Sequence, residues 1–157
     1  MFLVEVLKAA FLGAGASAAL SFCLNISRYD IAWGAFVGGI GWGVYTMLIP
    51  DSGVAGTESF FWGAMAVSVL SEILAYFIKN PTTVYLVPGL LPLVPGGGMF
   101  QTMRAAVTGD LAKALPLGLS ALLSAGAIAL AIALTSSLGR IIRSIIKQYK
   151  KRDKKIP

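Results

Sequence analysis

Apolar runs of about 20 residues recur along the whole sequence, and each is long enough to cross a membrane as a helix. A helix rises about 1.5 Å per residue, so such a run matches a hydrocarbon core of about 30 Å. Hydrocarbon offers no hydrogen-bond partners, and a helix satisfies its backbone within its own segment. The composition agrees, with 57% hydrophobic and 13% charged residues. We therefore expect an all-α, polytopic transmembrane helix bundle.

The links between the runs divide the chain into about five helices. The first run lacks the basic start and the short length of a signal peptide, so we interpret it as a retained helix. The fourth is interrupted by prolines and glycines. We predict one transmembrane domain over residues 1–139, with helices at about 6–24, 31–49, 59–78, 84–107 and 116–138.

A basic tail, residues 140–157, follows the last run directly. It holds most of the 13 basic residues, and isoleucines alternate with the cations in its first part. This pattern favours an amphipathic helix on anionic lipid headgroups. Nucleic acid is a poor fit, because no aromatic platform or known motif accompanies the charge. The basic residues of the tail are Arg140, Arg143, Lys147, Lys150, Lys151, Arg152, Lys154 and Lys155.

The basic residues also predict the orientation, because short cytoplasmic loops retain Lys and Arg. A cytoplasmic tail and five crossings place the N-terminus outside and the links at Arg28 and Lys79 inside. Arg104 and Lys113 then fall on the outer side, against the rule. Four crossings with a re-entrant fourth segment would place the N-terminus inside, and the sequence leaves both arrangements open.

Several kinds of chemistry are excluded by the residues that are missing. The chain has no histidine and one cysteine, Cys23, so it cannot form an internal disulfide, a His/Cys zinc site or a histidine-based catalytic centre. A membrane enzyme of lipid metabolism would group acidic metal ligands, whereas Asp30, Asp51, Glu58 and Asp110 are scattered. We expect no enzyme activity, no metal and no cofactor.

Small residues recur at four-residue spacing in the second predicted helix, at Gly34/Gly38 and Gly39/Gly43. This spacing permits close helix packing, and a direct role in lining a substrate path is the alternative. So many helix faces made of small residues indicate that the chain packs against helices of another subunit. That subunit is a partner or a second copy of the chain. Aromatic residues near predicted helix ends are interpreted as interfacial anchors; these are Trp33, Trp62, Tyr29, Tyr45, Tyr76 and Tyr85.

Glu72 lies deep in the third predicted helix. A carboxylate at such a depth costs about 2.5 to 3.5 kcal/mol on insertion scales, so it needs a reason to be there. One hypothesis is proton coupling in a carrier. The other is a structural Glu that is neutral or paired with a neighbouring helix, and Arg104 is the most plausible opposite charge.

The fourth segment carries the strongest functional signal. Pro88, Pro92 and Pro95 remove backbone donors and free carbonyls inside an apolar stretch. Such a break is tolerated where it is buried in protein or lines a cavity, and a half-helix N-terminus there points N–H groups at anions. We expect that helix to begin near Met99; a kinked packing helix is the alternative. The candidate substrate-binding residues are Pro92, Pro95, Gly96, Gly97, Gly98, Gln101, Thr102 and Arg104.

The stretch Pro92-Leu93-Val94-Pro95-Gly96-Gly97 resembles the threonine/serine exporter family. The chain length and the preceding Lys79-Asn80-Pro81 resemble its short, C-terminal-type subunits, as in two-component succinate exporters. The resemblance implies a bacterial inner-membrane exporter of small carboxylate-bearing metabolites, such as succinate, threonine or serine. It also implies a larger partner subunit and no enzyme activity. The alternative is a membrane scaffold that packs against a partner without transporting anything.

Overall fold

The computed structural model describes residues 2–49 and 56–153, and the side chains at 142–143 and 145–153 lie outside the description. Within these ranges the chain is helical and contains no β-strand, which confirms the predicted all-α fold. The elements are α1 (Phe2–Cys23), α2 (Arg28–Met47), α3 (Thr57–Ile78), α4 (Thr83–Leu90), the 3-10 turn η1 (Leu91–Leu93), α5 (Gly96–Val107) and α6 (Leu111–Asp153).

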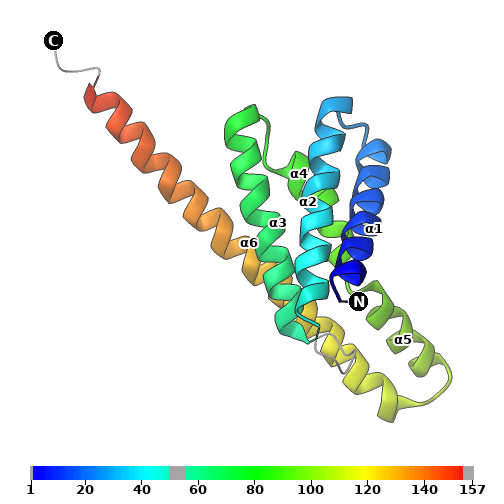
Figure 1. Cartoon of the computed structure of the whole chain (residues 1–157). Coiled ribbons are helices and arrows are strands. Elements are labelled where there is room, and N and C mark those ends of the chain that lie inside the picture. The colour runs from blue at the N-terminus through cyan, green and yellow to red at the C-terminus, as the bar shows by residue number, and fades with distance from the viewer. Residues whose placement is uncertain (1, 50–55, 154–157) are drawn as a thin grey trace.

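The elements cross the bundle in alternating directions (Figure 1). Helices α1, α2 and α3 stand side by side, α4 and α5 return in the direction of α2, and α6 runs obliquely past α3. The link after α1 and the link after α3 therefore lie at one end. The start of α1 and the turn between α5 and α6 lie at the other end.

Three helices are long and apolar enough to cross a membrane: α1, α3 and the Leu111–Ile141 part of α6. The broken pair Thr83–Leu93 and Gly96–Val107 passes the same test with a bend of 48°. Helix α2 is less apolar because it contains five glycines, but it is the central helix, packed against α1, α3, α4 and η1. Apolar character and length support a multi-pass membrane protein.

Helices α1 and α2 pack closely through small residues. A Cβ added at Gly38 would lie 2.6 Å from Ser17 Cβ, and one at Gly34 would lie 2.9 Å from Ser21 Oγ. A Cβ at Gly39 would lie 2.9 Å from the Ala10 carbonyl oxygen. No side chain larger than hydrogen fits without movement, so these glycines serve helix packing, as their spacing predicts.

The core surrounds α4, which is only eight residues long. Val37, Val67, Tyr85, Leu93 and Ala131 are fully buried there. Tyr85 and Tyr45 are therefore not interfacial anchors as predicted. Their rings complete the interior, because α4 and the C-terminal part of α2 lie inside the bundle.

Helix α6 extends beyond its predicted bounds on both sides. It begins at Leu111, continues through Pro116 and runs into the basic tail as far as Asp153. Pro116 gives up one backbone hydrogen bond without ending the helix, since neighbouring bonds hold the turn. Lys154 and Lys155 lie outside the described residues, and the binding of the tail to lipid stays a prediction.

Candidate functional site

The break in the fourth segment is a short turn between two helices. Helix α4 ends at Leu90, η1 covers Leu91–Leu93, and Pro95 forms the N-cap of α5. The Val94 N–H donates to the Leu91 carbonyl at 3.2 Å, and the Gly96 N–H donates to the Val94 carbonyl at 2.7 Å. Pro88, Pro92 and Pro95 have no N–H group to donate, so carbonyl oxygens near them lose a partner. The two bonds satisfy the carbonyl oxygens of Leu91 and Val94.

Leu93 anchors this turn in the bundle. Its side chain is fully buried, and a Cβ added at Gly63 would lie 2.9 Å from one of its methyl carbons. A Cβ at Gly41 would lie 3.6 Å from the other methyl carbon. Glycines on α2 and α3 thus leave the space that Leu93 fills, and the turn keeps a fixed place. Pro92 and Pro95, on either side, are half-buried.

Helix α5 begins at Gly96, three residues before the predicted start at Met99. The three glycines form its first turn, because the fixed φ of Pro95 ends the preceding turn and glycine adopts helical angles without strain. Gly96 and Gly97 are exposed, with no atom within 4 Å of an added Cβ. Among the described residues, the Gly97 and Gly98 N–H groups have no acceptor. They form an open helix N-terminus that attracts anions.

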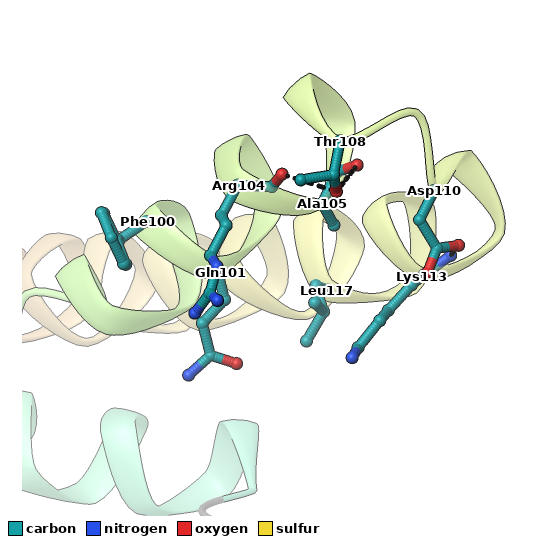
Figure 2. Close-up of a pocket in the computed structure, with 8 residues that line it drawn as sticks. All are labelled: Phe100, Gln101, Arg104, Ala105, Thr108, Asp110, Lys113 and Leu117. Atoms are coloured by element: carbon teal, nitrogen blue, oxygen red, sulfur yellow. Dashed lines mark hydrogen bonds between the residues drawn. The ribbon is translucent and has the colours of Figure 1, made fainter.

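One turn further on, α5 and the start of α6 enclose a half-open pocket of about 500 Å³. Figure 2 shows the side chains of Gln101, Arg104 and Lys113 extending to the same side of this hairpin. Arg104 runs back toward Gln101, as helical side chains tilt toward the N-terminus. The lining residues are Phe100, Gln101, Arg104, Ala105, Thr108, Asp110, Lys113 and Leu117.

The pocket is lined by two cationic side chains, Arg104 and Lys113, and one anionic side chain, Asp110. The Asp110 carboxylate already accepts a hydrogen bond. Asp110 Oδ1 accepts the Lys113 backbone N–H at 3.1 Å, which caps the start of α6. The Thr108 hydroxyl donates to the Arg104 carbonyl at 3.0 Å and so closes the end of α5. Within the described part of the chain, Arg104 and Lys113 form no ion pair. The pocket therefore presents positive charge and an amide to an incoming ligand.

Thr102 does not line this pocket. Its hydroxyl donates to the Gly98 carbonyl at 2.8 Å, and its methyl group would lie 3.1 Å from a Cβ at Gly118 on α6. Gly98 also faces α6, where an added Cβ would lie 3.5 Å from Ala121 Cβ. Both residues thus hold the hairpin together and leave Gln101 and Arg104 on its open side.

Glu72 and Arg104 lie beside different parts of α6. The Glu72 carboxylate is half-buried against Gly139, where an added Cβ would lie 2.9 Å from Oε2. Arg104 belongs to the hairpin, which contacts α6 around Gly118. At about 1.5 Å per residue these two places on α6 are about 30 Å apart. The sequence left open whether Glu72 and Arg104 meet, and in the structure they do not, because they lie beside different parts of the long α6.

The sequence analysis missed Lys113 as a pocket residue, although it placed Lys113 and Arg104 on the same side of the membrane. The signal that could have indicated Lys113 is the tight turn at Thr108-Gly109-Asp110, where Gly109 has a φ of 81°. A turn with a left-handed glycine and a capping aspartate folds α6 back on α5, which brings residues 104 and 113 together.

Comparison with known families gives one match over most of the chain. The model of the family described as "Threonine/Serine exporter, ThrE" matches residues 9–138, from the second turn of α1 to just before Gly139. No curated protein and no solved structure matches the chain.

Proposed function

Because this chain belongs to the threonine/serine exporter family, we propose that it is a subunit of an inner-membrane exporter of small carboxylate-bearing metabolites. The family is one of membrane exporters and not a class of enzymes. The substrate is a dicarboxylate such as succinate, or threonine or serine. The observation that carries the proposal is the pocket with Arg104, Lys113 and Gln101 beside the broken segment.

The chemistry of the pocket suits a carboxylate. A guanidinium binds a carboxylate through two parallel N–H bonds, and an ammonium adds an unspecific positive charge. A volume of about 500 Å³ falls within the range of small-molecule sites and has room for a four-carbon acid. The N–H groups of Gly97 and Gly98, which have no acceptor among the described residues, lie about 10 Å along α5 from Arg104. They offer a second, separate binding position for an anion.

A larger partner subunit is the second part of the proposal. Helix α5 packs against α6 alone among the described elements, while Gln101 and Arg104 are exposed on its free side. Such groups are too polar to face lipid and need protein or water beside them. A partner that covers this side would complete the pocket. A second copy of the chain is the alternative occupant.

The charged residues also support a proposal for the orientation of the chain in the membrane and for proton coupling of export. The start of α2 at Arg28 and the link after α3 that holds Lys79 lie at the end of the bundle toward which α6 runs into the basic tail, and we propose that this end is cytoplasmic. The tail would then rest on anionic lipid. Glu72 is the proposed proton-coupling group, since Gly139 leaves room for its carboxylate between α3 and α6.

The test is export by the co-expressed pair of subunits. In proteoliposomes loaded with succinate, threonine or serine, Arg104→Gln is expected to reduce export about ten- to a hundredfold, the effect of losing a hydrogen bond to a charged group. Arg104→Lys should retain part of the activity. Lys8→Gln, an exposed cation on α1, is the matched control. Wild-type export by Arg104→Gln, with the complex intact, would favour the scaffold function instead.

A further inference from the structure

The described helices form two units, and the division lies at the broken turn. In the first unit, α1 and α3 both pack against α2, α4 and η1. In the second, α5 packs against α6 alone (Figure 1). Among the described elements, α6 packs against α3 and α5 only. The two units therefore meet at one packing seam, between α3 and α6, and at one backbone link, residues 94–95.

The first unit holds α4 and η1 in place. At the start of α4, the Tyr85 hydroxyl donates to Asp30 Oδ1 of α2 at 2.6 Å. Near its end, a Cβ added at Gly89 would lie 2.8 Å from a methyl carbon of Val37. The buried side chain of Leu93 then anchors η1 between α2 and α3. The chain as far as Leu93 is thus a fixed part of the first unit.

The second unit is held together by close helix packing. Gly98 and Thr102 of α5 lie against Ala121 and Gly118 of α6. The residues that line the pocket all belong to α5, to α6 or to the turn between them. The pocket therefore keeps its shape if this unit changes position as a whole.

The seam between the units is lined by small residues on the α6 side. Ala131, Thr135 and Gly139 follow at four-residue spacing. The Thr135 hydroxyl donates to the Met65 sulfur of α3 at 3.1 Å, and the Glu72 carboxylate lies against Gly139. Large side chains interdigitate and fix the register of two helices. Small ones facing a flexible methionine leave a smoother surface, along which packed helices can slide.

The backbone link between the units leads into two unrestrained glycines. Gly96 and Gly97 follow Pro95 directly, and both are exposed. No atom lies within 4 Å of a Cβ added at either position. Glycine adopts many backbone angles without steric cost. A bend at these residues would turn α5 without moving η1.

We propose that α5 and α6 move as one unit against α1 to α4, with a hinge at Gly96 and Gly97 and a sliding seam along α3. The unit carries the pocket at Arg104 with it. Movement of one group of helices against another is how transporters open a site to each side of the membrane in turn. The use of this movement in export rests on the proposed function, whereas the movement itself does not.

Distances between pairs of spin labels test the movement in the full-length chain in lipid nanodiscs. In a Cys23→Ser background, the pair Leu3→Cys and Ala112→Cys joins the two units, and both positions are exposed. Its distance distribution should show two populations, or a spread of about 5 Å, the size of a one-turn helix shift. Added succinate should change the populations.

Two further pairs measure each unit by itself. Met99→Cys with Ala112→Cys lies within the second unit, and Leu3→Cys with Phe77→Cys lies within the first, all at exposed positions. Each pair should give one narrow distance. The proposal is overturned if the pair between the units is as narrow as these two. It is also overturned if the Met99 pair is as broad as the pair between the units.

Gly96→Ala combined with Gly97→Ala tests the hinge. Alanine fits the helical backbone and the open space at both positions and keeps the N–H groups, but it has fewer accessible backbone angles. The spread between the units should narrow to that of the pairs within a unit. Gly15→Ala, at an equally open position on α1, is the matched control and should leave the spread unchanged.

The outcomes separate the hinge from the transport function. A spread that stays unchanged in the double variant overturns the hinge at Gly96 and Gly97. A spread that narrows as expected, but with no response to succinate and no export in the transport assay, would count against the proposed function alone.

Discussion

At the scale of single residues, Ser17 and Gly38 make a close contact between α1 and α2. A Cβ at Gly38 would lie 2.6 Å from Ser17 Cβ, closer than two carbon atoms approach. The Ser17 hydroxyl is fully buried and has no hydrogen-bond partner in the described structure. Its value is therefore its small size rather than its hydrogen bonding.

Gly38→Ala should destabilise the bundle by about 1–3 kcal/mol, because the added methyl group forces α1 away from α2. Unfolding by sodium dodecyl sulfate in mixed micelles measures the change. Gly15→Ala on the outer face of α1, where an added Cβ meets no atom within 4 Å, is the matched control and should have little effect.

The double variant Ser17→Gly with Gly38→Ala exchanges the small residue between the two helices. It should recover most of the lost stability, since the atoms that clash are gone. If Gly38→Ala is as stable as the wild type, or if the double variant is the less stable of the two, the close contact does not support the bundle.

At the scale of the elements, the sequence predicted the helices better than their ends. Apolar runs and prolines are local signals, so the bundle and the broken fourth segment could be predicted. The start of α5 at Gly96 could not, because three glycines favour a turn and a helix almost equally until Pro95 and the contact with Ala121 decide. The proximity of Arg104 and Lys113 depends on the turn at Gly109, which no pattern of charges in the sequence reveals.

The burial of Tyr85 shows the same limit. A tyrosine near a helix end is typical of a membrane interface. Here α4 is enclosed by α1, α2 and α3, and Asp30 comes from a distant part of the chain to bind the hydroxyl. Only tertiary packing brings residues 30 and 85 together, so no local pattern indicates their hydrogen bond.

The hairpin of α5 and α6 is the element whose stability is easiest to test separately. Gly118→Val should loosen α5, because the larger side chain meets the Thr102 methyl group and α5 has no other neighbour among the described elements. Hydrogen exchange over residues 96–107 should speed up by about tenfold or more, with little change in α1 to α3.

Gly126→Val is the control on the same helix, since an added Cβ there meets no atom within 4 Å. If both variants exchange alike, Gly118 is not the packing point. If Gly118→Val also accelerates exchange in α1 to α3, the hairpin and the bundle unfold as one unit, against the separation seen in Figure 1.

At the scale of the whole molecule, the direction of the passes distinguishes five crossings from four. The link after α1 and the start of α6 lie at opposite ends of the bundle (Figure 1). The apolar part of α6, Leu111–Ile141, has 31 residues and is about 46 Å long. It exceeds a hydrocarbon core of about 30 Å, which fits the oblique course of α6. A broken segment that passes through the bundle yields five crossings, whereas a re-entrant one yields four.

In a Cys23→Ser background, Ser27→Cys and Ala112→Cys should react with a membrane-impermeant thiol reagent from opposite sides. Both positions are exposed, one in the link after α1 and the other in the first turn of α6. The basic residues near residue 27 predict labelling from the cytoplasm there and from outside at residue 112. Leu122→Cys, on the apolar face of α6, should react from neither side. Labelling of both test positions from the same side would mean that α4 and α5 enter and leave on one face, since only a re-entrant segment removes a crossing between them.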